Sequence, residues 1–179
     1  MPKSMGTDMH SREWKYCPWC STPLVETYVF GANHMACPNC EFIYFPRPNL
    51  VVMVVVEHQG KILLGRRNME PGRGKWTLLG GYVSKGERVE EAAVREIKEE
   101  TNLDVQLEGL LGLYDDLDTP LVLAVYSARV KNEHVELARQ VDEIRELAFF
   151  SVENLPELAF PSDKQIIDDW IKSRPKGPA

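Results

Sequence analysis

Three glutamates, Glu96, Glu99 and Glu100, crowd the stretch Arg95–Asn102, which reads REIKEETN. Like charges four residues apart on a helix repel each other and destabilise it. The residues Arg88–Thr101 nonetheless follow a helical pattern, because apolar residues recur at the spacing of one helix face. Whatever fold this chain adopts must therefore compensate a dense cluster of negative charge on a helix.

The phase of this helix turns the glutamates toward the protein interior. At about 100° per residue, three apolar residues define its buried side: Val89, Ala93 and Ile97. Glu96 and Glu100 fall within that side, and Glu99 flanks it. The opposite face, which we expect to be exposed, holds Glu91, Val94 and Lys98. A charge run is usually a solvated surface, but this phase favours partly buried carboxylates.

Carboxylates on a partly buried face need a compensating positive charge. Arg95 can pair with one of the three glutamates but not with all of them. A hard divalent cation with oxygen ligands is the simplest solution. Because Mg²⁺ keeps several waters and binds a few carboxylates together with substrate phosphates, the pattern predicts a phosphorylated substrate.

The segment Gly81–Leu103 resembles the Nudix box, G-x5-E-x7-R-E-U-x-E-E-x-G-U, where U is a bulky apolar residue. Gly81, Glu87 and Arg95–Glu100 occupy its defined positions. Asn102 departs from the pattern, since it stands where the family has glycine. Asparagine tolerates left-handed backbone next best after glycine, so we expect the helix still to end there. The resemblance implies an α/β fold, with a mixed β-sheet sandwiched between helices.

The resemblance also implies roles for individual residues. A catalytic Mg²⁺ or Mn²⁺ would be bound by the backbone carbonyl of Gly80 and by the side chains of Glu96, Glu99 and Glu100. Arg95 would orient these glutamates and be held in turn by Glu87. Many family members carry another glutamate in a late loop, for which this chain offers Glu143 and Glu146. We choose Glu143 as an extra metal ligand or water-activating base, although a plain exposed loop acid fits its position equally well.

The cysteines form two pairs, CPWC and CPNC, separated by 16 residues: Cys17, Cys20, Cys37 and Cys40. This is a spacing of zinc sites. Four thiolates leave no open position, so the zinc would be structural and would stabilise a unit too small to fold on its own core. A redox pair would need a βαβ pattern nearby, and a nucleic-acid ribbon would need more basic residues. His34 lies between the pairs and is not expected to bind the metal.

The 179 residues divide into four predicted segments: a mobile tail 1–15, a zinc ribbon 16–45, a hydrolase domain 46–174 and a C-terminal tail 175–179. Strands are expected at Leu50–Val56, Lys61–Arg66, Trp76–Gly81, Val105–Tyr114, Leu121–Val130 and Leu147–Phe150. The first is continuous and β-branched, which is typical of a strand buried on both faces, and it forms a hairpin with the second. A last helix is expected at Asp163–Ser173, with Ser162 and Gln165 as its capping box.

Charge and hydropathy restrict the partners. A net charge of −6 argues against broad contact with a nucleic-acid backbone. No apolar run is long enough to span a bilayer, and the N-terminal residues lack the apolar core of a signal peptide. Because paired cysteines in a reducing compartment favour metal over disulfides, we expect a cytoplasmic protein. The resemblance is also compatible with a homodimer, as in many family members.

The resemblance implies a hydrolase that splits the pyrophosphate bond of a nucleoside diphosphate linked to another moiety. A four-cysteine ribbon before the box is similar to NADH pyrophosphatases and to shorter enzymes acting on FAD and ADP-ribose. The SQPWPFPxS-like motif of the NADH group is absent after the box, and the stretch LAFPSDKQ (residues 158–165) fits the shorter group better. The alternative is a Nudix-like module that senses a nucleotide without cleaving it, but the intact glutamates favour an enzyme.

Two further sets of side chains are candidates for contacts with a nucleotide. Aromatic rings that could stack on a base are Tyr44, Phe45, Trp76, Tyr114 and Phe160, although core packing is the commoner role of such residues. Arg66 and Arg67 follow a strand near the predicted site and are candidates for phosphate contacts, with an ordinary surface role equally compatible.

Overall fold

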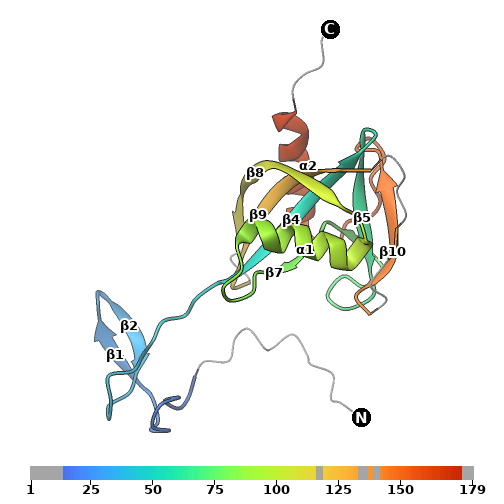
Figure 1. The fold of residues 1–179 in the computed structure, drawn as a ribbon. Helices are drawn as coiled ribbons and strands as arrows, with labels where there is room; N and C mark the ends of the chain where they lie inside the picture. The colour runs from blue at the N-terminus through green and yellow to red at the C-terminus, as the bar shows by residue number, and fades with distance from the viewer. Residues whose placement is uncertain (1–13, 116–118, 133–136, 139–141, 175–179) are drawn as a thin grey trace. The chain divides into compact units, whose positions relative to one another are not determined.

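The structure is a computed structural model, and it describes residues 14–115, 119–132, 137–138 and 142–174. Most of the predicted N-terminal tail and the whole C-terminal tail lie outside these residues. The chain forms two compact units, Met1–Pro48 and Asn49–Ala179 (Figure 1). In the described part of the chain, no helix has the length and apolar character needed to cross a membrane.

The smaller unit is built around a three-stranded antiparallel sheet. Its strands lie in the order β1 (Val25–Val29), β2 (Ala32–Ala36) and β3 (Ile43–Tyr44). Its buried apolar cluster consists only of Cys17, Leu24 and Cys37 among the described residues. Two of those three residues are cysteines, so side chains that could bind a metal make up most of this core.

The larger unit contains a seven-stranded sheet. Its strands are β4 (Asn49–His58), β5 (Lys61–Arg67), β6 (Trp76–Thr77), β7 (Leu79–Tyr82), β8 (Val105–Asp115), β9 (Leu121–Val130) and β10 (Ile144–Phe150). The main order is β10-β5-β4-β9-β8. The sheet is mixed, because β4 runs parallel to β9 whereas its other neighbours are antiparallel. The predicted hairpin between β4 and β5 is confirmed.

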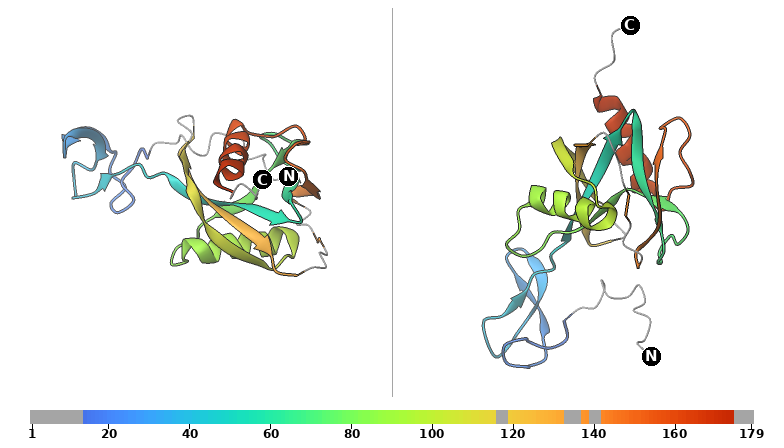
Figure 2. Two further views of the ribbon diagram at one scale, coloured as in Figure 1. Left: turned by 90° about the horizontal axis from the view of Figure 1, so that it is seen from above. Right: turned by 45° about the vertical axis from the view of Figure 1, so that its right-hand side comes forward.

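Two helices cover opposite faces of this sheet: α1 (Val89–Thr101) and α2 (Pro161–Ser173) (Figure 2). Alternate side chains of β4 point to the two faces, as the period of a strand requires. Val54 packs in the cluster that contains Ile97 of α1, whereas Val55 packs with Ile166 of α2. The prediction of a strand buried on both faces, within a sheet between helices, is confirmed.

The prediction of one strand over Trp76–Gly81 is wrong, because this segment pairs with two different strands. β4 and β5 pair with each other only next to their hairpin turn. Farther along, β6 pairs with β5 and β7 pairs with β4. Leu78 stands between β6 and β7, at the point where the chain crosses from one partner strand to the other.

The start of the last helix also differs from the prediction. α2 begins at Pro161 rather than at Asp163, since proline suits a first helical position, where its missing N–H is not needed. The predicted capping box of Ser162 and Gln165 is wrong as well. Instead, the Asp163 carboxylate accepts a hydrogen bond of 3.3 Å from the backbone N–H of Phe160.

Candidate active site

The glutamates of α1 lie at three different depths. Ile97 is fully buried, and Glu100 is 5% exposed. The side chain of Glu96 is 15% exposed and that of Glu99 is 53% exposed. The predicted helical phase is therefore correct for the glutamates. Val94 is a correction, because it is partly buried against the core rather than exposed.

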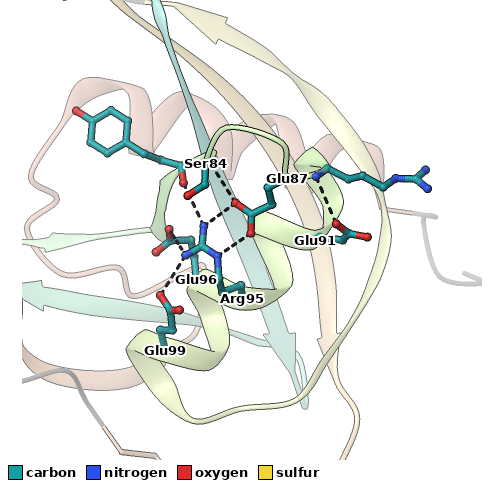
Figure 3. A network of polar contacts seen from close by, with 8 residues as sticks. Ser84, Glu87, Glu91, Arg95, Glu96 and Glu99 are labelled. Atoms are coloured by element: carbon teal, nitrogen blue, oxygen red, sulfur yellow. Dashed lines mark hydrogen bonds and ion pairs between the residues drawn. The ribbon is translucent and has the colours of Figure 1, made fainter.

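Arg95 is the centre of a network of carboxylates (Figure 3). Its guanidinium donates to both carboxylate oxygens of Glu87, at 2.7 and 2.9 Å. It also donates to Glu96 at 2.7 Å, to Glu99 at 3.1 Å and to the carbonyl of Tyr82 at 3.2 Å. Its hydrogen bonds hold the pKa of Glu87 at about 2. A bidentate pair of this kind fixes the guanidinium in one orientation, so two glutamates of the box are held by an arginine that is itself held.

Glu100 is the buried acid of the site. Its Oε2 accepts a hydrogen bond of 3.0 Å from the backbone N–H of Gly80. Burial raises the pKa of Glu100 to about 8, the charges of Glu96 and Glu143 act in the same direction, and that of Arg67 opposes them. A carboxyl in this setting is stabilised in its charged form by a nearby cation.

The two glycines before α1 have no room for a side chain. Gly80 has φ +152°, and a Cβ there would overlap the carbonyl oxygen of Val52 in the neighbouring strand. A Cβ on Gly81 would lie 2.5 Å from the carboxylate of Glu96. The double glycine therefore brings the backbone of β7 directly against the carboxylates of α1.

The donor atoms of this site fit a hard divalent cation, because carboxylate and carbonyl oxygens are the ligands that Mg²⁺ prefers. The three glutamates do not converge on one point, however. Within the described residues, only the four cysteines bring three or more His, Cys, Asp or Glu ligand atoms within 4.8 Å of one another. Glu96 and Glu99 are turned toward Arg95, while Glu100 contacts Gly80.

The two late glutamates lie in different surroundings. Glu146 forms an ion pair of 3.3 Å with Arg66. Glu143 is exposed, and its backbone carbonyl accepts a hydrogen bond of 2.8 Å from Asn68 at the end of β5. Its charge acts on Glu100, which places it on the side of the buried acid. Of the two candidates, Glu143 is thus the one whose carboxylate is not paired with Arg66.

Arg67 is a half-buried cation beside the same acids. Its Nε donates to the carbonyl of Pro71 at 2.7 Å, and its guanidinium lies 5.0 Å from the ring centroid of Phe160. Burial lowers its pKa, which the charges of nearby carboxylates, Asp163 first among them, act to raise. Arg67 forms no ion pair within the described part of the chain, whereas Arg66 binds Glu146. Arg67 thus remains available to an anion, and Phe160 is already occupied as its ring partner.

Two other predicted stacking residues belong to the core. Trp76 packs edge-on against Phe150, with ring centroids 4.7 Å apart, and both lie on the cluster around α2. Tyr114 packs on the same cluster. Trp76 and Tyr114 therefore have the core-packing role that is commoner for aromatic residues.

The four cysteines meet at one point of the smaller unit. The Sγ atoms of Cys17 and Cys40 are 3.5 Å apart, as are those of Cys20 and Cys37. Tetrahedral zinc with Zn–S bonds of about 2.3 Å sets its sulfurs about 3.8 Å apart, so the cluster fits a zinc ion. His34 is not part of it and packs against the ring of Phe45.

Sequence reasoning missed Asp163, an acid that is 1% exposed. Its Oδ1 accepts hydrogen bonds from the hydroxyl of Thr77 at 3.0 Å and from the N–H of Leu78 at 3.2 Å. Burial raises its pKa to about 6. An acid in the first turn of a helix is ordinary helix chemistry, so nothing in the local pattern separates this one from an exposed residue.

Comparison with known proteins identifies the class. Residues 46–170 match the NUDIX domain. The chain is 39% identical over 129 residues to an ADP-ribose pyrophosphatase of Methanocaldococcus jannaschii, covering 70% of this chain and 74% of that protein. It is 29% identical over 147 residues to the NAD-capped RNA hydrolase NudC of Stutzerimonas stutzeri, covering 80% of this chain and 50% of that protein. A crystal structure of a NUDIX hydrolase from Nitrosomonas europaea has a TM-score of 0.82 and 26% identity, covering 92% of this chain and 94% of that one.

The chain therefore belongs to the Nudix family of hydrolases. The family, the fold and the enzyme class predicted from the box are confirmed. The chain spans about half the length of the NudC protein it matches.

Proposed function

We propose that this Nudix hydrolase is a metal-dependent pyrophosphatase. It splits the pyrophosphate bond of a nucleoside diphosphate linked to another moiety and releases two phosphorylated products. The observation that carries the proposal is Glu100, a buried carboxyl that contacts the backbone of Gly80 and feels the charges of two further acids. A carboxyl buried beside two further acids is stabilised in its charged form by a cation, and a diphosphate is a substrate that such a cation serves.

The proposed ligands of Mg²⁺ or Mn²⁺ are the carbonyl of Gly80 and the side chains of Glu96, Glu99 and Glu100. When bound, the metal neutralises the diphosphate and polarises its phosphorus. Arg95 keeps Glu96 and Glu99 in place, since its guanidinium is fixed by Glu87. Glu143 is proposed as the extra ligand or as the base that activates water.

Arg67 is our candidate for a direct contact with the diphosphate. Its half-buried guanidinium lacks an ion-pair partner within the described residues, and an arginine fork matches phosphate oxygens well. Arg66 is the weaker candidate because it is engaged by Glu146.

ADP-ribose is the first substrate to test, because the relative named an ADP-ribose pyrophosphatase shares 39% identity with this chain. FAD and NADH remain in the proposed class. NAD-capped RNA enters the test through the NudC relatives, although the net charge of −6 disfavours extended nucleic acid.

The smaller unit is proposed to hold structural zinc at Cys17, Cys20, Cys37 and Cys40. Free thiolates suit a reducing compartment, so we propose that the protein works in the cytoplasm. A homodimer is the proposed assembly, to be tested by sedimentation of the purified protein.

The test of the function is a substrate panel with purified protein and Mg²⁺ or Mn²⁺. ADP-ribose, FAD, NADH, diadenosine polyphosphates, nucleoside triphosphates and NAD-capped RNA are incubated with wild type and with Glu100→Gln, and products are separated by chromatography. The expected result is metal-dependent cleavage of ADP-ribose to AMP and ribose 5-phosphate, lost in Glu100→Gln. Tight binding of a nucleotide without any cleavage would instead favour the sensing module.

A further inference from the structure

The crossing point at Leu78 leaves one backbone donor outside the sheet. Thr77 pairs with Gly65 of β5, and Leu79 pairs with Val54 of β4. The N–H of Leu78, between these two pairings, donates to Oδ1 of Asp163 at the start of α2. A buried N–H without a partner is costly, so the acid completes the hydrogen bonding of the crossing.

The chain just before Asp163 holds the same segment through backbone hydrogen bonds. The N–H of Trp76 donates to the carbonyl of Glu157 at 3.0 Å, and the N–H of Ala159 donates to the carbonyl of Trp76 at 2.7 Å. Together with the two bonds to Asp163, these contacts fix three consecutive residues, Trp76–Leu78. The last helix and the segment before it thus act as a clamp on the strand that leads into the double glycine.

Attachment of α2 to the sheet does not by itself require a buried acid. Ile166, Ile167 and Trp170 already pack this helix against the sheet. A carboxylate taken out of water lowers stability unless donors surround it. Asp163 has three donors, from Thr77, Leu78 and Phe160, and a carboxylate offers acceptors only. The bond from Phe160 caps α2, whereas the bonds from Thr77 and Leu78 tie the start of this helix to the crossing of the sheet.

The backbone position of Leu78 matters because Gly80 is two residues away. Gly80 binds Glu100 through its N–H and has no free space toward Val52. A shift of Leu78 therefore moves the carbonyl of Gly80 and the carboxylate of Glu100 together. Misplacement of a reacting group by about 1 Å lowers rates by about a hundredfold.

We propose that Asp163 is a positioning residue for the metal site, acting through Leu78 on the carbonyl of Gly80 and on Glu100. This rests on the proposed function, in which Gly80 and Glu100 bind the catalytic metal. Within the described residues, the hydrogen bonds of Asp163 go to Thr77, Leu78 and Phe160, so its proposed effect on the metal passes through Leu78. The motif LAFPSDKQ thereby gains a role, since its Ala159 and Asp163 supply three of the four hydrogen bonds of the clamp and Glu157 supplies the fourth.

The test measures Mn²⁺ affinity by electron paramagnetic resonance of free Mn²⁺, alongside the Mg²⁺ concentration that half-saturates hydrolysis. Four variants of the full chain are compared with wild type: Asp163→Ala, Asp163→Asn, Thr77→Val and Ile166→Ala. Ile166→Ala is the matched control, because it weakens the packing of α2 in the cluster that also contains Leu78 but removes none of the hydrogen bonds of Asp163. All measurements are made below each variant's unfolding midpoint, so that stability and positioning are separated.

For Asp163→Ala, we expect Mn²⁺ affinity to fall about tenfold or more, as is typical when residues that orient metal ligands are lost. Asp163→Asn should recover most of this loss, since its amide oxygen can still accept from Leu78. Thr77→Val should weaken binding about threefold, because it removes one of three donors. Ile166→Ala should lower the midpoint and leave Mn²⁺ affinity at the wild-type value.

Wild-type metal affinity in Asp163→Ala would overturn the proposal, as would an equal loss in Ile166→Ala. If Asp163→Ala does not fold, the comparison of Thr77→Val with Ile166→Ala decides. Equal Mn²⁺ affinities of these two variants would overturn the proposal. Failure of the proposed function has a separate signature, in which Glu100→Gln leaves Mn²⁺ binding unchanged, and that result overturns both.

Discussion

The two units of this chain use potential metal ligands for different purposes: the smaller unit has thiols in its core, and the larger unit has carboxylates beside a core that is apolar. In the smaller unit, two of the three residues of the buried cluster are cysteines, Cys17 and Cys37, while Trp19 and Phe30 are largely exposed. In the larger unit, apolar clusters on both faces of the sheet hold the fold. The glutamates of α1 add a charge cluster that the fold tolerates. Metal is thus expected to stabilise the first unit and to activate the second.

The strongest test of this difference between the units is removal of the proposed zinc. Cys37→Ser, or a strong chelator, should unfold the smaller unit and leave the larger one folded, because zinc-finger peptides gain about 10–16 kcal/mol from their metal. Amide NMR spectra would show the collapse of resonances from β1 and β2 alone. His34→Ala is the control, since His34 lies outside the cluster. A Cys37→Ser spectrum with all resonances dispersed would contradict the expectation.

Loss of Glu100 should separate activity from stability in the larger unit. Glu100→Gln should lower kcat by about a hundredfold or more, since even residues behind metal ligands matter tenfold to a hundredfold. Its thermal midpoint without metal should stay equal or rise, because the amide keeps an acceptor for Gly80 and removes a buried acid. Calorimetry and initial rates measure the two effects. Glu91→Gln, on the exposed face of α1, is the control, and a parallel loss of stability in Glu100→Gln would contradict this reading.

Asp163 gives the larger unit a pH dependence of defined sign. Its carboxyl pKa rises from 3.8 to about 6 on folding, so the folded chain holds the proton longer than the unfolded chain. This contribution to stability is present in full below pH 3.8 and is lost as pH rises through about 6. The loss amounts to about 3 kcal/mol at most. Asp163→Asn should remove it.

The measurement is the free energy of unfolding by urea at several pH values between 4 and 7. Wild type should lose stability across this interval relative to Asp163→Asn, whatever the absolute difference between them. Parallel curves would show that Asp163 titrates alike in the folded and unfolded chains.

The smallest effect is expected at the mismatch in the box. Asn102 ends α1 in the left-handed conformation, with φ 62°, and its N–H donates to Lys98 at 2.9 Å. Asn102→Gly should change stability by less than about 1 kcal/mol, because relief of strain and loss of chain entropy oppose each other. Activity should not change. Asn102→Ala should cost about 1 kcal/mol, and a large loss of activity in Asn102→Gly would show that this residue does more than end the helix.

Several features of the fold and of the site could be predicted from local sequence patterns. The run Leu50–Val56 predicted a strand buried on both faces, because apolar residues at every position leave no polar side. The phase of α1 placed Glu100 inside and Glu99 at the edge, as found. The tolerance of asparagine for positive φ predicted the end of the helix. Each of these depends on residues within about two helical turns of one another.

Contacts between segments that are distant in the sequence could not be predicted from local patterns. The crossing at Leu78 arises because β4 and β5 pair only near their turn, which no property of Trp76–Gly81 reveals. Asp163 resembles any acid in a first helical turn until Leu78 is brought to it. The difference between Arg66 and Arg67 likewise appears only when Glu146 of β10 pairs with one of them.

The sequence by itself determined the class of this protein, because the Nudix box and the paired cysteines encode their chemistry in fixed local spacings. Tertiary structure decided which charges are paired and which remain available to a ligand. It left Arg67 without an ion-pair partner among the described residues and brought Asp163 against the strand that leads to Gly80. The physical reason is that burial and hydrogen-bond partners depend on residues far apart in the chain, whereas helical phase and ligand spacing do not.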